Sequence, residues 1–379
     1  MRYYTAGESH GQGLVAIVED VPAGLKISEE QINVDLARRQ VGYGRGGRMK
    51  IERDTAQVIS GVRFGRTIGS PVAMLVANRD WENWTERMAP FGEPPLDLAR
   101  EVTPRPGHGS LGGALKTNTD DCRNIRERSS ARTTAPRVAA AGIAREFLAD
   151  LGVEIFSYVT GIGNAVMKEE DPFMNAARYT PLEIETSEVR CPDAEASEAM
   201  KREIDRAIKN KDSLGGTFRV VVRGLLPGVG GYAVPTERLT STIGGALFSI
   251  PAIKGVEFGM GFETARKPGS QVHDPILLNR AKAEFTRASN NAGGLEGGMT
   301  TGMPLVVTAA MKPIPTLMQP LQTVNLDTLE VAQASKERSD VCAVPACAVV
   351  AEGEVAFAIA DAYMRKFGSD NMADIKAAI

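Results

Sequence analysis

The chain has only three histidines, so few of its side chains can transfer a proton near neutral pH. His10 lies in G-E-S-H-G and His108 lies in R-P-G-H-G, and the flanking glycines let a ligand approach the backbone closely. His273 lies among charged residues in a segment whose pattern predicts a helix, and we interpret it as a structural residue. Because loops on a rigid scaffold often carry functional sites, we predict acid–base roles for His10 and His108.

The stretch GYGRGG, Gly42 to Gly47, matches the G-x-G-x-x-G pattern of dinucleotide-binding turns. In such a turn the glycines follow a strand and precede a helix. Here Ser28 and Gln31 form a capping-box pattern that predicts a helix before the glycines, whereas the residues after them alternate like a strand. The order is reversed, so we reject a Rossmann turn. Basic residues crowd this loop, which indicates that it binds an anion. They include Arg39, Arg45 and Arg48.

A second group of arginines lies in D-C-R-N-I-R-E-R-S-S-A-R, Asp121 to Arg132, just before and within the start of a predicted helix. Helix N-termini bind anions through free N–H groups, and the hydroxyls of Ser129 and Ser130 add donors. The alternative is a solvated helix start in which Glu127 and Asp121 pair with the arginines, and this stretch alone favours neither interpretation. Two arginine groups and two glycine-flanked histidines together indicate acid–base chemistry on a small molecule that carries several negative charges.

Two later stretches could complete such a site. Asp340 follows Arg338 and leads into an apolar run, so its carboxylate could be a positioned base or part of a loop salt bridge. Lys312 to Thr316 follows a predicted strand and could place a cation and a hydroxyl on a phosphate. The glycines between Gly293 and Met303 allow either close approach of a ligand or tight turns.

The composition is that of an ordinary globular protein of 379 residues, with 43% hydrophobic residues, 24% charged residues and a net charge of −3. Aromatic residues make up 6% and do not interleave with the arginines, which argues against the alternative of an RNA-binding module. The four cysteines form no C-x-x-C pair and no His lies at zinc-ligand spacing, so we predict no metal site and interpret them as packing thiols of a cytoplasmic protein. No apolar run predicts a membrane span or a signal peptide.

Helix and strand patterns follow one another without the repeated β-α-β units of a parallel sheet. We predict a single α+β domain over residues 1–379, in which helices cover sheets. Helices are predicted at 29–40, 129–151, 196–211, 238–250, 270–283 and 349–367. Residues 78–104 contain both Trp residues and many Pro and charged residues, and we predict that they form a long irregular loop at the active site.

Several of these stretches together resemble the chorismate synthase family, and the resemblance covers nearly the whole chain. The motifs that carry it are T-A-G-E-S-H-G (Thr5 to Gly11), R-R-Q-V-G-Y-G-R-G-G-R-M (Arg38 to Met49), R-P-G-H (Arg105 to His108), E-R-S-S-A-R (Glu127 to Arg132), N-N-A-G-G (Asn290 to Gly294) and R-S-D-V-C-A-V-P-A (Arg338 to Ala346). This family converts 5-enolpyruvylshikimate-3-phosphate to chorismate by 1,4-elimination of phosphate, and it requires reduced FMN although the reaction has no net redox change. The resemblance implies a homotetramer whose subunit packs helices between antiparallel β-sheets.

The resemblance also implies a role for each matching residue. His10 would protonate the departing phosphate, His108 would protonate or hydrogen-bond to the reduced flavin, and Asp340 would help to remove the substrate proton through flavin N5. The substrate's phosphate and carboxylates would be held by Arg39, Arg45, Arg48, Arg132 and Arg338. FMN would contact Arg128, Ser129, Ser130, Pro251, Ala252, Gly297, Lys312, Pro313, Ile314, Pro315, Thr316 and Arg338.

In members that reduce their own flavin, the family pattern assigns Arg39 and Arg45 to NADPH; a separate flavin reductase is the alternative source of reduced FMN. The chain departs from the family pattern near His108. Ser110 stands where the family usually has Asp, Thr117 where it has Tyr, and Thr133 where it has Glu. These departures bear on the hydrogen bonds around His108.

Overall fold

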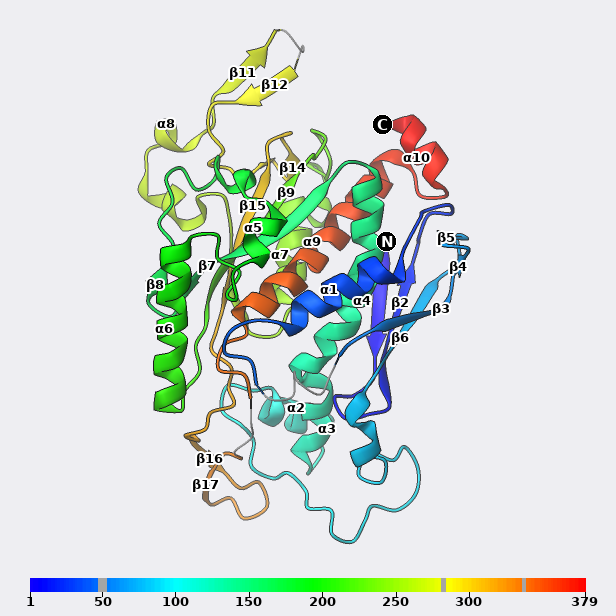
Figure 1. The fold of residues 1–379 in the computed structure, drawn as a ribbon, viewed down its shortest axis with the longest axis vertical. Coiled ribbons are helices and arrows are strands. Elements are labelled where there is room, and N and C mark those ends of the chain that lie inside the picture. The colour runs from blue at the N-terminus through cyan, green and yellow to red at the C-terminus, as the bar shows by residue number, and fades with distance from the viewer. Residues whose placement is uncertain (47–52, 281–283, 336–338) are drawn as a thin grey trace.

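Two antiparallel sheets enclose a layer of helices in the computed structural model, which describes residues 1–46, 53–280, 284–335 and 339–379 (Figure 1). The first sheet has the strand order β1 (Arg2–Ala6), β2 (Gly13–Glu19), β6 (Val72–Ala77) and β3 (Ala56–Ser60). The second has the order β10 (Ile253–Phe258), β15 (Leu305–Met311), β9 (Gly216–Arg223), β7 (Glu154–Ile162) and β8 (Ala165–Val166). Neighbouring strands in both sheets are antiparallel.

The helix layer contains α1 (Glu29–Gln40), α4 (Thr134–Asp150) and α9 (Val344–Phe367), with α7 (Leu239–Phe248) packed against α9 and β10. α4 contacts β2 and β6 of the first sheet, α9 contacts β7 and β9 of the second, and the two helices pack against each other (Figure 1). Gly353 of α9 makes this contact close, because a Cβ atom there would lie 2.5 Å from the Cβ of Ala141. The predicted architecture, with helices between antiparallel sheets, is therefore confirmed.

The remaining elements are short or lie outside this layer. The helices are α2 (Ser110–Thr117), α3 (Cys122–Ser129), α5 (Pro181–Glu185), α6 (Ala194–Asn210), α8 (Gly269–Val272) and α10 (Met372–Ala378). Four hairpins pair β4 (Val62–Arg63) with β5 (Arg66–Thr67), β11 (Ile276–Asn279) with β12 (Glu284–Arg287), β13 (Leu295–Glu296) with β14 (Met299–Thr300), and β16 (Gln322–Val324) with β17 (Val331–Gln333).

Three predicted helices differ in extent from the observed ones. The helix predicted at 129–151 begins only at Thr134, after a 3-10 turn at Ala131–Thr133, and the helix predicted at 349–367 already begins at Val344. No helix was predicted where α3 lies, at Cys122–Ser129. The segment 270–283 is helical only as far as Val272, since Pro275 disfavours helical backbone at the residue before it, and β11 follows.

The segment 78–104 is irregular apart from a 3-10 turn at Arg79–Asn83, as predicted, and it runs below the helix layer (Figure 1). Its far end is tied to the body by backbone hydrogen bonds from Cys122 N to Glu101 O and from Leu326 N to Val102 O, both 2.9 Å. The loop therefore begins and ends on the structured body of the protein.

A cluster of charged side chains is buried in the helix layer. Glu352 of α9 accepts hydrogen bonds of 2.6 to 3.1 Å from Arg38, Arg145, Arg190 and Ser157. Burial alone would raise the pKa of Glu352, but the three guanidinium groups lower it far below its ordinary value. Arg38 therefore has a structural role in the core, although the next residue in the sequence, Arg39, is a predicted site residue.

The cysteines of the described residues have the surroundings of ordinary core residues. Cys122, Cys191, Cys342 and Cys347 are all buried and unpaired, which agrees with their interpretation as packing residues. Burial raises the pKa of Cys342 to about 11 and that of Cys347 to about 12. Within the ranges that the structure describes, no helix combines the length and apolarity of a membrane span, and no group of ligand-type side chains is arranged to hold a metal ion.

Candidate active site

His10 lies in the turn between β1 and β2 and is held by Glu127 of α3. The backbone N–H of His10 donates to Glu127 Oε2 at 2.8 Å, and the ring Nδ1 lies 2.9 Å from Oε1 and 3.0 Å from Oε2. The backbone N–H of Ser9 donates to the carbonyl oxygen of Glu127 at 2.9 Å. One residue of α3 therefore fixes both the turn and the imidazole ring.

Trp84 brings the 78–104 loop onto His10. The two rings have centroids 4.1 Å apart and planes inclined by 35°. The guanidinium carbon of Arg123 lies 5.2 Å from the Trp84 ring centroid, and Arg123 Nη1 donates to Glu127 Oε1 at 3.3 Å. These four residues, His10, Trp84, Arg123 and Glu127, form one packed group that we name the His10 cluster.

Arg39 and Arg132 share the buried carboxylate of Asp54. Arg39 Nη2 donates to Asp54 Oδ2 and Arg132 Nη1 donates to Oδ1, each at 2.5 Å. Burial alone would raise the pKa of Asp54, but the charges of Arg39 and Arg132 lower it. Among the described residues, these two guanidinium groups share the carboxylate of Asp54. Arg39 Nε is buried and has no hydrogen-bond partner among the described residues, so this group suits an anionic ligand.

The described part of GYGRGG, Gly42 to Gly46, packs against the segment that contains Asp340. Gly46 N donates to Asp340 Oδ1 at 2.6 Å, and Arg45 Nη1 lies 2.9 Å from Oδ2. A side chain at Gly46 would not fit easily, because its Cβ would lie 3.1 Å from the carbonyl group of Ser339. α1 precedes this loop, as predicted, where a Rossmann turn would need a strand.

His108 lies on the turn before α2 and keeps a side-chain partner despite the departures from the family pattern. Its Nδ1 lies 2.7 Å from Ser110 Oγ, so Ser110 supplies a hydrogen bond at the position where the family usually has Asp. Thr117 Oγ1 and Thr133 Oγ1 donate to backbone carbonyls at 3.0 and 2.8 Å. The hydroxyls of Ser110, Thr117 and Thr133 are therefore all hydrogen-bonded.

The loop Lys312–Thr316 packs against the His108 turn. Lys312 Nζ donates to Gly107 O at 2.5 Å, and Arg105 Nη1 donates to Thr316 Oγ1 at 2.8 Å. Lys312 N donates to Ala252 O at 2.9 Å, which brings the Pro251–Ala252 corner to the same place. The structure thus joins three of the segments that the resemblance assigns to FMN.

Of the two alternatives for the arginines between Asp121 and Arg132, the helix N-terminus does not apply to Arg123 and Arg126. Asp121 caps α3 by accepting from Arg123 N at 2.9 Å, and Arg123 and Arg126 then lie along α3, paired with Glu127 and Glu101. The salt-bridged alternative describes this part of the stretch. The reason is that α3 ends, rather than begins, at the serine pair.

Arg128, Ser129 and Ser130 lie at the end of α3, beside the His10 turn. Arg128 Nη2 donates to Thr5 O at 2.6 Å and to Thr5 Oγ1 at 2.7 Å, so its guanidinium holds the end of β1. Ser129 Oγ donates to a carbonyl of α3 at 2.7 Å, and Ser130 Oγ lies 3.2 Å from Ser9 Oγ. Arg128 and Ser129 are exposed.

Asn78 joins the His10 cluster to the buried arginines. Its Nδ2 donates to Gly11 O at 2.7 Å, and its Oδ1 accepts from Arg132 Nε at 2.9 Å. Arg45 Nη2 donates to Arg39 O at 3.5 Å, and Arg45 also pairs with Asp340, so Asp340 is connected to the buried arginines. His10, Asp340 and the three described substrate arginines, Arg39, Arg45 and Arg132, are therefore linked through these contacts.

Gly297 lies apart from the other predicted flavin contacts. It follows β13, and the carbonyl of Gly298 accepts from Leu239 N at the start of α7, whereas Pro251 and Ala252 follow the end of α7. The 10 residues of α7 span about 15 Å at the usual helical rise. Within one chain, the structure does not bring Gly297 to the Lys312–Thr316 loop.

Arg48 and Arg338 lie outside the described residues, so their predicted positions in the site stay predictions. Sequence reasoning missed the roles of Asp54, Trp84 and Glu127. Glu127 stands inside the E-R-S-S-A-R motif, and the pairing of an acidic residue with a glycine-flanked histidine was the signal that could have found it. Asp54 carries no comparable signal, because its two arginine partners are distant in the sequence.

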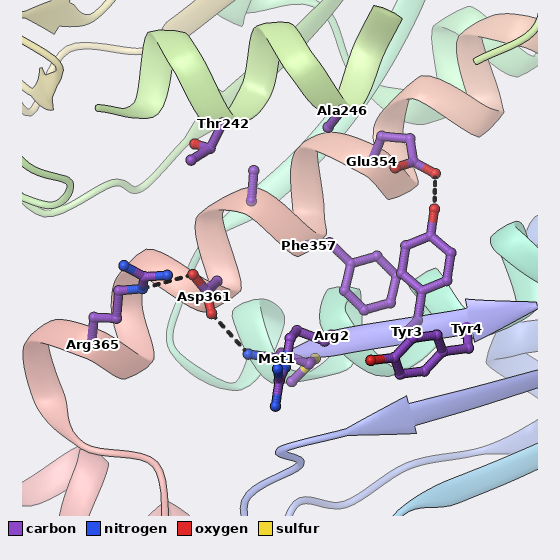
Figure 2. A pocket seen from close by; sticks show the side chains of 11 residues that line it. Met1, Arg2, Tyr3, Tyr4, Thr242, Ala246, Glu354, Phe357, Asp361 and Arg365 are labelled. Atoms are coloured by element: carbon purple, nitrogen blue, oxygen red, sulfur yellow. Dashed lines mark hydrogen bonds and ion pairs between the residues drawn. The ribbon is translucent and has the colours of Figure 1, made fainter. Parts of the chain in front are cut away.

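Figure 2 shows a groove between β1, α7 and α9 that is separate from this network. Tyr3 and Phe357 form its apolar side, with ring centroids 4.5 Å apart. Its polar groups pair with one another, since the Tyr3 hydroxyl donates to Glu354 at 2.7 Å and the Met1 ammonium group donates to Asp361 at 3.0 Å. None of the predicted site residues lines it, and we assign it no role.

Comparison with known proteins gives the same answer as the motifs. A family model described as chorismate synthase matches residues 1–364. The chain belongs to the chorismate synthase family. The chorismate synthase of Aquifex aeolicus (strain VF5) is 50% identical over 381 residues, which cover 99% of this chain and 96% of that protein. The chorismate synthase of Bacillus subtilis (strain 168) is 51% identical over 385 residues, covering 99% and 97%.

The fold agrees with a solved structure described as "Crystal Structure of Chorismate Synthase". That structure superimposes with a TM-score of 0.80 at 41% sequence identity, and the match covers 100% of this chain and 95% of the other. The protein is therefore a carbon–oxygen lyase that forms chorismate from 5-enolpyruvylshikimate-3-phosphate by 1,4-elimination of phosphate, the last step of the shikimate pathway.

Proposed function

We propose that the chorismate-forming elimination uses reduced FMN, and that residues 1–379 form one catalytic domain around it. The residues present fit this cofactor. Lys312 places a cation beside the His108 turn, and Gly107 has φ of +78°, a conformation that favours glycine and keeps this turn free of a side chain. When bound, reduced FMN supplies an electron-rich partner for the departure of phosphate. His108 would donate a hydrogen bond to it, oriented by Ser110.

The observation that carries the proposal is the pair of buried guanidinium groups joined to the His10 turn through Asn78. Arg39 and Arg132 share Asp54, and Arg39 Nε is buried without a hydrogen-bond partner among the described residues. A substrate with a phosphate and two carboxylates would supply acceptors for such donors. We propose that Arg45, Arg48 and Arg338 hold the same substrate; Arg45 belongs to the network by its ion pair with Asp340.

The proton steps are assigned to His10 and Asp340. As the C–O bond breaks, its electron pair leaves with the phosphate oxygen, and His10 would deliver a proton to that oxygen. Loss of the C–H proton then forms the new double bond, and Asp340 would assist that loss. Trp84 covers the His10 ring, which supports a role for the 78–104 loop in excluding water from the site.

We infer that the functional unit is a homotetramer in which Gly297 completes the flavin site of a neighbouring subunit. Gly297 is exposed and distant from the other flavin contacts of its own chain. Co-expressed His108→Ala and Gly297→Trp chains, each inactive alone, are expected to form hybrid tetramers with about a quarter of the normal activity, because one subunit restores what the other lacks. Hybrids without activity would show that both residues act within one chain.

The source of reduced flavin and the cellular setting are also proposals. The buried, reduced cysteines support a cytoplasmic protein. Arg39 is engaged with Asp54 and has little exposed surface, which favours substrate rather than NADPH as the ligand of this residue and a separate flavin reductase as the reductant. Burial of the two central arginines also argues against nucleic acid, which is bound at exposed cations.

An anaerobic assay tests the function. Protein, chemically reduced FMN and 5-enolpyruvylshikimate-3-phosphate are mixed, and chorismate is followed by its absorbance. Turnover is expected with reduced FMN and absent with oxidised FMN. Reduced FMN without chorismate formation would contradict the proposal. Addition of NADPH in place of the chemical reductant decides whether the protein reduces its own flavin.

A further inference from the structure

Glu127 contacts the His10 ring at Nδ1, as a residue that orients a proton-donating imidazole must do. We propose that Glu127 is a positioning residue that keeps the His10 imidazole with Nδ1 as the hydrogen-bond donor and so presents Nε2–H to the departing phosphate. This inference rests on the proposed role of His10 as the acid, and it adds a residue to which the family pattern assigned no role.

The contact geometry fixes the tautomer. A carboxylate that is ionised can only accept hydrogen bonds, so His10 Nδ1, at 2.9 Å from Oε1 and 3.0 Å from Oε2, must carry the proton of this pair. Burial alone would raise the pKa of Glu127, but the hydrogen bonds and charge of His10, with the charge of Arg123, lower it. Glu127 is therefore an anion at neutral pH, and the neutral imidazole keeps Nδ1–H.

Three features make this contact selective for one ring orientation. The same carboxylate also accepts a hydrogen bond from the His10 backbone N–H at 2.8 Å, which holds it close to the ring. A rotation of the ring away from Glu127 would break the hydrogen bond between Nδ1 and this carboxylate. The Glu127 side chain is only 3% exposed, so water competes little for its oxygens. Trp84 lies against the ring, which restricts a flip.

Charged side chains from two elements lie near His10. The described groups nearest to it are Glu127, Arg123 and, on the same turn, the exposed Glu8. Glu127 is in direct contact, whereas Arg123 reaches the ring only through Trp84 and Glu127. When the C–O bond breaks, the proton on Nε2 passes to the phosphate oxygen that receives the electron pair. His10 is then neutral and retains Nδ1–H on Glu127.

Substitution of Glu127 by Gln removes the charge and keeps the shape. We expect kcat to fall by about 100-fold, within the range of a general acid's contribution, while the dissociation constant of FMN is unchanged. The limb on which activity falls with rising pH is expected to move to lower pH, because a protonated imidazole loses the carboxylate that it contacts. Glu8→Gln removes a charge from the same turn without touching the ring, and it is the matched control for a general field effect.

The tautomer can be observed apart from turnover. With only three histidines, protein labelled with 15N-histidine gives few ring signals, and His10→Ala identifies those of His10 by solid-state NMR. Wild-type protein is expected to show Nδ1 protonated in the neutral ring, and Glu127→Gln a mixture of tautomers. Glu127→Asp, which keeps the charge, is expected to recover the wild-type pH limb and part of kcat, and its behaviour guards against loss of folding in the Gln variant.

A double-mutant comparison separates this inference from the role of His10. If Glu127 acts through His10, Glu127→Gln lowers turnover no further once His10→Ala is present. A further loss of comparable size in that background, an unchanged pH limb, or an equal shift in Glu8→Gln would overturn the positioning role. If His10→Ala itself retains turnover, the proposed acid is wrong, whatever the Glu127 variants show.

Discussion

His10→Ala is expected to lose turnover by about 100- to 10,000-fold while binding FMN as the wild type does. The loss follows from removal of the proton donor to the phosphate oxygen, for which a general acid typically contributes this range. FMN binding is expected to survive because the contacts that join the Lys312–Thr316 loop to the His108 turn are made by Lys312 and Arg105 and do not depend on His10. Single-turnover chorismate formation with reduced FMN measures the first quantity, and flavin fluorescence measures the second.

The chain supplies its own matched control. His273 is exposed at the end of α8, so His273→Ala removes an imidazole without touching the network, and its turnover should be normal. His108→Ala should behave differently from both, with weakened FMN binding. If His10→Ala lost FMN affinity and turnover in equal proportion, His10 would be a flavin contact rather than the substrate's acid.

The sequence predicted well those elements whose apolar spacing and capping residues lie within one short stretch of chain. α1 was predicted at 29–40 and spans those residues, because Ser28 caps it and its apolar spacing is regular. The failures have local causes too. The helix predicted at 129–151 starts late, because a 3-10 turn at Ala131–Thr133 precedes α4 and Pro136 lies in the first turn of α4, where proline is tolerated. Pro275 could have been taken as the end of the helix predicted at 270–283.

The site was predictable in its residue types and less so in its pairings. Glycine-flanked histidines and grouped arginines could be recognised from short stretches, and the network contains His10, Arg39, Arg45, Arg132 and Asp340. Their carboxylate partners could not, since Asp54 meets Arg132 across 78 residues and Glu127 meets His10 across 117. Long-range ion pairs depend on how sheets and helices stack, which no local pattern encodes.

The ion pairs of Glu352 are also long-range and could not be predicted from the sequence. Its substitution is the change for which we expect the largest loss of stability. Glu352→Ala is expected to lower the free energy of unfolding at neutral pH by about 3 to 5 kcal/mol, because it leaves three buried guanidinium groups without their carboxylate. Arg38, Arg145 and Arg190 all donate to it, at 2.6 to 3.1 Å. Urea unfolding at one fixed protein concentration measures the change.

Glu154→Ala is the control for this loss. Glu154 pairs with Arg223 at a partly exposed position, where an ion pair contributes about 1 kcal/mol or less. If both variants lost the same free energy of unfolding, the buried ion pairs of Glu352 would contribute no more to stability than an ion pair at the surface.

The pH dependence of the same experiment has a defined sign. The guanidinium groups lower the pKa of Glu352 in the folded protein, although burial opposes them, whereas in the unfolded chain the group titrates near its usual value of about 4.3. Its contribution is therefore fully present above that value and is lost as the pH falls below it. The stability difference between wild type and Glu352→Ala is expected to be constant from pH 8 to about pH 5 and to shrink towards pH 3. A difference that grew on acidification would mean that Glu352 is protonated in the native state and that the arginines are neutralised by another group.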